Sequence, residues 1–243
     1  MTPILGIMAS QISGHLINAP TTIDYLVVGA GGAGGVNGRG GGAGGELFTS
    51  NTVSISAGVT YTCTIGAGAN WTSNNARNGS SSVLSGSGFT TVTALAGQDA
   101  GDPNGGVGQN GGGSGGNYGG SGTTGANGTA NSLSGSSVTY VGGGGGGANS
   151  DNSAAGGSGG GGAGGSVFTG SFLPTAGTAN TGGGGGGCGN GQIYYNIIGG
   201  SGLIIIRYDN TKDNAVSTTG SPTFSNSGGY KRYTFTGSGS ITF

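Results

Sequence analysis

Few residues in this 243-residue sequence could act in acid–base or nucleophilic catalysis. It contains one histidine, His15, and one glutamate, Glu46. A catalytic nucleophile needs a general base that a third group holds in place. His15 lies in an apolar leader, where a packed or hydrogen-bonded side chain is favoured over a base. The sequence therefore predicts a protein that is not an enzyme and has no catalytic residues.

Carboxylates are paired twice, at Asp99 and Asp102 and at Asp209 and Asp213. Such pairs can bind metal ions or share acid–base work. Both pairs lie in polar, loop-like sequence, and Asp side chains bond readily to their own backbone in turns. We therefore interpret them as turn-forming residues and predict no metal site.

The glycine runs contain many matches to the dinucleotide-binding pattern G-x-G-x-x-G, including some directly after residues 25–28. That pattern binds a cofactor only where a strand precedes it and a helix follows. No helical periodicity follows any of these matches, so we predict no cofactor. The two cysteines, Cys63 and Cys188, have neither metal-binding nor redox spacing. Two free thiols are the favoured interpretation, and a disulfide stays open.

Charge and hydropathy exclude two classes of partner. With six Lys and Arg against seven Asp and Glu, the formal net charge is −1, so a nucleic-acid surface is not expected. Lys231 and Arg232 form the one adjacent basic pair, and we interpret it as a solvated strand edge. No apolar run reaches the roughly 18 residues of a membrane span, so no membrane insertion is predicted.

Aromatic and amide side chains in the polar loops have the composition of a binding surface. Tyr and Trp offer large contact areas at low entropic cost, and Asn offers adaptable hydrogen bonds. The residues that we assign to receptor-binding loops are Trp71, Tyr118, Asn149, Asp151, Asn152, Phe172, Tyr194 and Tyr195. The alternative, that the aromatic members only cap the glycine-rich part, stays open.

Glycine makes up 67 of the 243 residues and is gathered into runs at 29–45, 111–120, 142–147, 156–165 and 182–191. Ordering glycine is entropically costly, so isolated runs would be disordered. Threefold extended helices point their backbone groups outward, and such helices can pair with neighbours when no Cβ separates them. We therefore predict a bundle of polyglycine II helices, with alanines such as Ala33, Ala43 and Ala163 on outer faces.

Strand patterns flank the glycine-rich middle. Residues 23–28 and 203–208 are apolar runs, residues 53–65 alternate with period two, and 80–96 indicate a hairpin. Residues 230–243 also alternate, around Gly-Ser-Gly, and predict a C-terminal hairpin. We expect an all-β fold with almost no α-helix: an antiparallel sheet or sandwich base built from both halves of the chain, with the strand at 24–28 near the C-terminal hairpin.

The first twenty residues are apolar and differ from the rest of the chain. We expect this segment to dock onto another protein through Ile4, Leu5, Ile7, Met8 and Leu16. An arm packed on its own domain is the alternative. The expected organisation is a docking segment at 1–22, a β-rich base at 23–96, a polyglycine II bundle with loops at 97–200, and returning strands at 201–243.

Two stretches carry a resemblance to a known family. Tyr25-Leu-Val-Val-Gly-Ala-Gly-Gly32 and Gly199-Gly-Ser-Gly-Leu-Ile-Ile-Ile-Arg-Tyr208 resemble the glycine-rich domain of bacteriophage tail proteins. In many of those, a strand like residues 233–243 precedes the Leu-Val-Val-Gly strand, whereas here it ends the chain. The alternation of glycine runs and loops is also similar to that of tail-fibre tip adhesins, which bind host receptors through loops between polyglycine II helices.

The resemblance implies a virion protein at a tail or fibre tip, made in the host cytoplasm. Its expected partners are another tail or fibre protein, bound through the N-terminal segment, and a host surface protein or glycan, with a homotrimer as a candidate assembly. Two rival functions remain: a purely structural tail, fibre or capsid component without a receptor, and an antifreeze-like polyglycine II protein.

Overall fold

The computed structural model of the chain describes residues 18–70, 79–101, 104–167, 172–194 and 197–243. Several residues singled out above lie outside the described residues, and no structural statement concerns them. These are His15, Trp71, Asp102, Tyr195 and the five docking residues Ile4, Leu5, Ile7, Met8 and Leu16.

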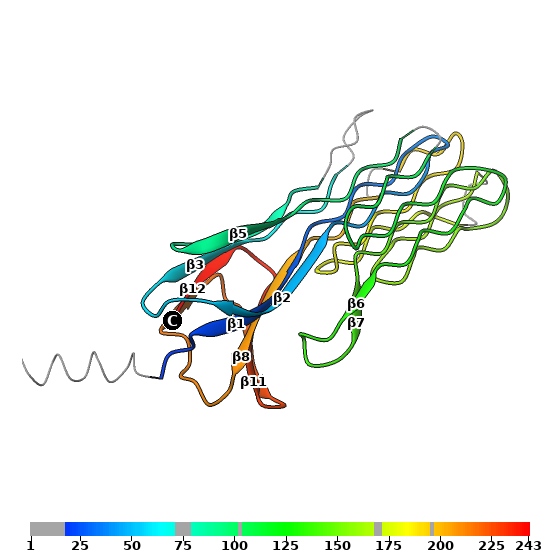
Figure 1. Cartoon of the computed structure of the whole chain (residues 1–243). Helices are drawn as coiled ribbons and strands as arrows, with labels where there is room; N and C mark the ends of the chain where they lie inside the picture. Colours follow the sequence, from blue (N-terminus) through cyan, green and yellow to red (C-terminus); the bar gives the residue numbers. More distant parts are fainter. Residues whose placement is uncertain (1–17, 71–78, 102–103, 168–171, 195–196) are drawn as a thin grey trace, which may run out of the picture.

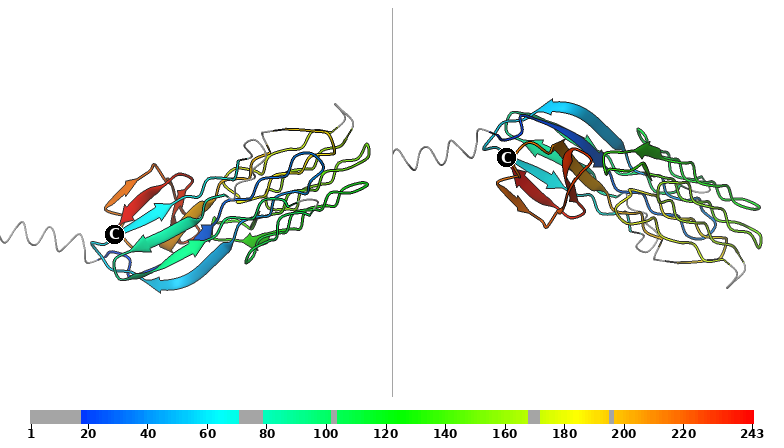
Figure 2. Two further views of the ribbon diagram at one scale, coloured as in Figure 1. Left: turned by 90° about the horizontal axis from the view of Figure 1, so that it is seen from above. Right: turned by 90° about the horizontal axis from the view of Figure 1, so that it is seen from below.

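The described residues form an all-β structure of antiparallel strands, as predicted, and none of them is in a helix (Figure 1). The strands are β1 Thr22–Val28, β2 Leu47–Ser54, β3 Thr60–Thr64, β4 Ser82–Gly86, β5 Phe89–Ala94, β6 Thr129–Asn131, β7 Val138–Tyr140, β8 Leu203–Asp209, β9 Ser217–Thr219, β10 Thr223–Ser227, β11 Tyr230–Phe235 and β12 Gly239–Thr242. The C-terminus lies at the end of the molecule that contains the two sheets, and the glycine runs extend away from that end (Figures 1 and 2).

Two five-stranded sheets are built from both halves of the chain, which confirms that prediction. The first sheet has the order β10-β11-β8-β1-β2, and the second has the order β5-β4-β3-β12-β9. β1 pairs with β8, which in turn pairs with β11. The predicted hairpin at 230–243 is wrong, because β11 joins the first sheet whereas β12 joins the second. The bend at 236–238 lets the chain cross between sheets.

The inner faces of the two sheets share one hydrophobic core. From the first sheet, β1, β8 and β11 contribute alternate residues, and from the second, β3, β4 and β12 do the same; its largest fully buried members are Ile23, Tyr61, Leu84, Ile204, Ile206, Phe235, Ile241 and Phe243. Aromatic rings meet edge to face within it, as Tyr208 and Phe243 do at 5.3 Å between centroids. This packing of alternate residues is that of a β-sandwich.

The outer face of the first sheet is partly covered by the β6–β7 hairpin. Leu133 and Tyr140 pack on Leu26 and Leu203 in a second buried cluster. β1 and β8 are therefore apolar on both faces, which explains why their sequences read as continuous apolar runs rather than as alternation. The hairpin lies within residues 97–200, where only polyglycine II helices and loops were expected, and it corrects that expectation.

The basic pair on β11 also differs from expectation. Lys231 and Arg232 are buried, at 9% and 6% exposure, so the interpretation as a solvated strand edge is wrong. Arg232 donates through Nε to the carbonyl of Leu133 and through Nη1 to that of Ser227. The Lys231 ammonium group donates to the carbonyl of Lys212. Both cations therefore hold loops against the sheet rather than face solvent.

The glycine runs lie side by side beyond the sheets and form what we call the glycine body (Figures 1 and 2). Its hydrogen bonds recur with period three. In the central run at 141–147, the amides of Gly142 and Gly145 donate to Gly159 and Gly162, those of Gly143 and Gly146 to Ala126 and Thr123, and those of Gly144 and Gly147 to Gly42 and Arg39, at 2.8–3.1 Å. Every third residue therefore addresses the same neighbouring segment.

The carbonyl oxygens of this run follow the same rule toward three other segments. They accept from Gly113, Gly116 and Gly119, from Gly184 and Gly187, and from Gly157. The run thus exchanges hydrogen bonds with six neighbouring segments of the described chain. The runs at 29–35, 40–45 and 182–188 each do the same with six segments of their own. Because buried backbone groups must be paired, these lateral bonds account for how the runs can be ordered.

Many glycines inside the glycine body have no room for a side chain, because neighbouring backbone lies against them. A Cβ on Gly143, Gly144 or Gly145 would lie 2.1, 2.0 and 2.2 Å from a carbonyl oxygen of a different adjacent segment. Three successive residues therefore face three different neighbours. The expectation that Ala33 and Ala43 lie on outer faces is wrong, because both are fully buried.

Candidate functional site

Five loops between glycine runs meet at the end of the glycine body that is remote from the sheets. We call residues 36–39, 117–122, 148–153, 166–173 and 189–196 the tip loops, of which 168–171 and 195–196 lie outside the described residues. Direct hydrogen bonds join them. They run from the Asn37 amide to the Gln192 carbonyl, from Gln192 Nε2 to the Val167 carbonyl, from Asn152 Nδ2 to Ser121 Oγ, and from the Asn149 amide to the Gly119 carbonyl.

The structure brings the described members of the predicted receptor-binding set together on the tip loops. Asn149, Asp151 and Asn152 are exposed on one loop, and Phe172 is 46% exposed on another. Tyr118 is half-buried against Gly38, where a Cβ would lie 3.3 Å from Tyr118 Cζ and 3.5 Å from Asn190 Cα. Polar and aromatic groups from separate parts of the sequence therefore share one end of the molecule.

Two further apolar side chains belong to the same surface and were not singled out from the sequence. Leu173 is 55% exposed and Ile193 is 57% exposed, and both are on tip loops. Exposure of large aliphatic side chains is a mark of interaction surfaces where they gather. The sequence signal that could have found them is that each follows glycine-rich sequence and is surrounded by mostly polar residues.

Beneath the tip loops lies a small apolar cluster of Val36, Cys188 and Ile197, and Tyr194 packs against it. Cys188 and Cys63 are both free and buried, which confirms the favoured interpretation of two free thiols. Burial raises the pKa of Cys63 to about 12 and that of Cys188 to about 11, the latter despite a backbone hydrogen bond from Tyr194. Neither thiol is therefore a nucleophile at neutral pH.

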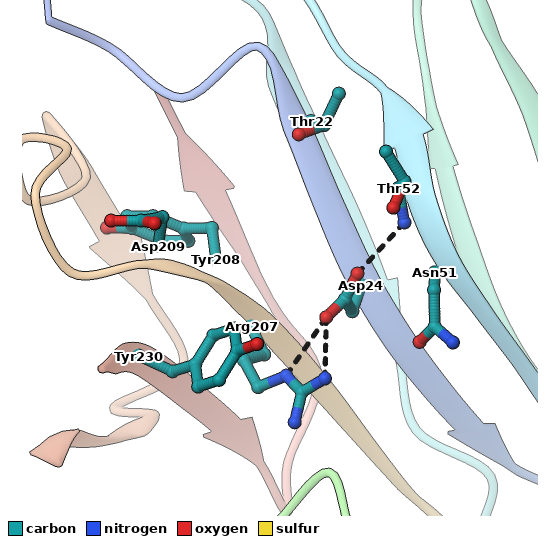
Figure 3. A pocket seen from close by; sticks show the side chains of 8 residues that line it. All are labelled: Thr22, Asp24, Asn51, Thr52, Arg207, Tyr208, Asp209 and Tyr230. Carbon is teal, nitrogen blue, oxygen red and sulfur yellow. Dashed lines mark hydrogen bonds and ion pairs between the residues drawn. The ribbon is translucent and has the colours of Figure 1, made fainter. Parts of the chain in front are cut away.

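A second candidate site was not predicted from the sequence. It is a pocket of about 360 Å³ on the first sheet, distant from the tip loops, and it is lined by Thr22, Asp24, Asn51, Thr52, Arg207, Tyr208, Asp209 and Tyr230 (Figure 3). We call it the sheet pocket. Its lining residues come from β1, β2, β8 and β11, so strand pairing fixes their backbone positions.

An ion pair occupies the floor of the sheet pocket. Arg207 donates to Asp24 Oδ2 through Nε at 3.0 Å and through Nη2 at 2.7 Å, and Asp24 Oδ1 accepts the Thr52 amide at 2.9 Å. Asp24 and Arg207 are cross-strand partners in the β1–β8 pair. The Arg207 guanidinium also lies 4.2 Å from the centroid of the Tyr230 ring, a cation–π distance. Charge on the floor is thus neutralised and both side chains are fixed.

The β1–β2 pairing is irregular beside this ion pair. Ile23 pairs with Val53 but Tyr25 pairs with Ser50, so Asn51 and Thr52 together oppose Asp24. This is a β-bulge, a feature that redirects side chains and is common beside binding sites. Thr52 has a φ of +57°, which is strained for a β-branched residue. The bulge aims Asn51 and Thr52 at the sheet pocket.

Of the two carboxylate pairs in the sequence, Asp99, Asp209 and Asp213 are among the described residues. Asp209 Oδ1 accepts from the amide and hydroxyl of Thr211 at 2.8 and 2.6 Å, a turn of the kind predicted, and these bonds lower the pKa of Asp209. Burial raises the pKa of Asp99, against the opposing effects of its own backbone and Arg39. Within the described residues, no three His, Cys, Asp or Glu side chains are placed to hold a metal ion.

Comparison with known proteins gives one family. A family model, described as a glycine-rich domain, matches residues 11–209. This range includes all the glycine runs and ends at the last residue of β8. Neither a curated protein nor a solved structure matches the chain. No helix in the described ranges is both long and apolar enough to span a membrane.

Proposed function

The chain belongs to the glycine-rich domain family, and we propose that it is a non-enzymatic attachment protein of a bacteriophage virion, located at the tail or tail-fibre tip. In this proposal the glycine body is a bundle of polyglycine II helices. The sandwich is its base, and the tip loops bind a host surface protein or glycan. Phage origin rests on the resemblance of residues 25–32 and 199–208 to tail proteins.

The period of the hydrogen bonds supports the polyglycine II assignment. A threefold helix directs successive backbone groups 120° apart, so residues i and i+3 address the same neighbour. This is the pattern of residues 142, 145 and 148, whose amides donate to Gly159, Gly162 and Gly165. A β-strand would address alternate neighbours with period two. Six neighbours around each of four runs is the coordination of hexagonal packing.

The observation that supports receptor binding is the gathering of the tip loops at the end opposite the sheets (Figures 1 and 2). The lateral bonds of the central run at 141–147 are backbone to backbone, so the side chains of the tip loops can change without removing them. Binding residues are characteristically carried on loops that a rigid scaffold positions. In the same proposal, residues 1–20 dock the protein onto another tail or fibre protein of the virion.

Exchange of tip loops between phages tests this function. Replacing the tip loops at 148–153 and 166–173 with the loops of a phage of different host range should change the host range. The matched control is substitution of Ser136 and Ser137, exposed residues of the β6–β7 hairpin on the sheet side, which should leave host range unchanged. Unaltered host range after the tip exchange, with intact particles, would overturn the receptor role and leave a purely structural component. Deletion of residues 1–20 should abolish incorporation into particles.

A further inference from the structure

We propose that the sheet pocket is a second binding site, independent of the tip loops, and that its ligand is a neutral saccharide of one or two pyranose rings. The geometry points to this class through the volume of the pocket, the balance of its charges and the mixture of hydrogen-bonding groups on its walls.

The volume and lining exclude an extended or apolar ligand. About 360 Å³ is near the lower limit of roughly 300–1,000 Å³ for small-molecule sites. Most such sites are lined mainly by apolar side chains, whereas every residue that lines this one carries a polar group. A polar ligand of modest size is therefore the class that fits.

The charges favour a neutral ligand. Both oxygens of Asp24 already accept hydrogen bonds, and Nε and Nη2 of Arg207 already donate them. A carboxylate or phosphate ligand could reach only Nη1 of Arg207 without displacing Asp24, and there it would meet the carboxylates of Asp24 and Asp209. A cationic ligand would meet Arg207. Breaking a partly buried ion pair is costly because one charge is left without its partner.

The remaining groups suit hydroxyls. Arg207 Nη1, the Asn51 amide group and the Thr22 hydroxyl form no hydrogen bond with the described residues, and Asp209 retains Oδ2 as an acceptor. These groups comprise both donors and acceptors, and sugar hydroxyls both donate and accept. The guanidinium groups of Arg207 and Arg232 lie over the Tyr230 ring, 4.2 and 5.5 Å from its centroid, and hold it in place. Tyr230 is 36% exposed, so its ring edge and its hydroxyl can contact a sugar.

The bulge adds an independent argument. An ordinary β1–β2 pairing would need neither the extra residue nor the positive φ of Thr52. Strain of this kind persists where the surroundings impose it, and it concentrates at binding and active sites. Here its effect is to place Asn51 and Thr52 over the ion pair, as Figure 3 shows.

The experiment is a titration of the full chain with methyl glycosides of glucose, galactose, mannose and N-acetylglucosamine, followed by amide chemical shifts. At least one should shift the amides of Asn51, Thr52 and Tyr230 and leave those of Asn149 and Phe172 unmoved. Asn51→Ala and Tyr230→Ala should each weaken that binding about tenfold, the loss of one good polar or aromatic contact. Thr22→Ala removes a hydroxyl from the pocket wall and should weaken the binding. Its matched control is Thr218→Ala, which removes an exposed hydroxyl of β9 and should leave the binding unchanged.

Each other outcome overturns the proposal. Shifts confined to the tip loops would transfer saccharide binding to that surface. Binding of glucuronate or phosphate without the neutral glycosides would show that the site takes anions. Binding that survives both Asn51→Ala and Tyr230→Ala would show that the sheet pocket is not a saccharide site. The same conclusion would follow if no glycoside bound at concentrations up to 50-fold above a weak dissociation constant of about 1 mM. Host range after tip-loop exchange is a separate measurement, so the two proposals fail independently.

Discussion

Substitution of Gly144 by alanine is the most informative single perturbation of the glycine body. Gly144 lies in the middle of the run at 141–147, where its amide donates to Gly42 and its carbonyl accepts from Gly116. A Cβ would lie 2.0 Å from the carbonyl oxygen of Gly185 and 2.5 Å from its carbon. Both distances fall more than an ångström short of van der Waals contact, and the obstruction is backbone that cannot rotate away.

The magnitude follows from what must move. Separating two packed runs costs about 1–3 kcal/mol as overpacking. Each buried backbone hydrogen bond that is lost as a result adds about 1–3 kcal/mol. We expect Gly144→Ala to lower the free energy of unfolding by at least about 3 kcal/mol. For a chain of this size, at about 2–4 °C per kcal/mol, the melting temperature should fall by about 6–12 °C.

The assay is thermal unfolding followed by circular dichroism, with Gly120→Ala as the control. Gly120 lies on a tip loop, and a Cβ there would meet no atom within 4 Å. Because alanine also reduces the entropy of the unfolded chain, this control should unfold at or slightly above the wild-type temperature. If Gly144→Ala unfolds within 1 °C of Gly120→Ala, the runs are not packed backbone against backbone and the reasoning is wrong.

Three further predictions concern separate parts of the fold. Both cysteines are buried and their pKa values are raised to about 12 and about 11, so iodoacetamide at pH 8 should label neither in the native protein and both in guanidinium chloride; rapid native labelling would contradict their burial. Leu133→Ala should lower the free energy of unfolding in urea by about 2–5 kcal/mol, because Leu133 fixes the β6–β7 hairpin to the first sheet, and a loss below about 1 kcal/mol would contradict this packing. Burial raises the pKa of Asp99 in the folded state, so folding favours the protonated carboxyl group. The stability that results is present below pH 3.8, the ordinary pKa, and is lost as the pH rises through the raised pKa. Asp99→Asn should accordingly gain stability relative to wild type between pH 3 and pH 7 in urea unfolding, whereas a gain that is the same at both pH values would contradict the assignment.

The sequence predicts most strands because their side-chain patterns are local. Apolar runs at β1 and β8 and alternation at β3 indicate strands wherever they pair. Pairing itself is less predictable. Residues 230–243 have the alternation of a hairpin, and only the tertiary structure shows that the Gly-Ser-Gly bend sends β12 to the second sheet.

The candidate sites differ in the same way. The sequence singled out residues of the tip loops because aromatic and amide side chains interrupt the glycine runs, whereas the gathering of these loops at one end was not predicted. The sheet pocket could not be predicted, because it depends on one extra residue in the β1–β2 pairing. Residues 49–52 are all polar, so they contain no alternation from which the bulge could be predicted. Likewise, the burial of Lys231 and Arg232 depends on carbonyl partners that adjacent basic residues do not reveal.

The most direct test of the proposal that the glycine body is a bundle of polyglycine II helices is the detection of scalar couplings across its hydrogen bonds by NMR. The account predicts couplings from the amides of residues 142, 143 and 144 to the carbonyl carbons of Gly159, Ala126 and Gly42, in three different segments, with the first neighbour returning at residue 145. Couplings that alternate between two segments, or unprotected amides with none, would contradict it.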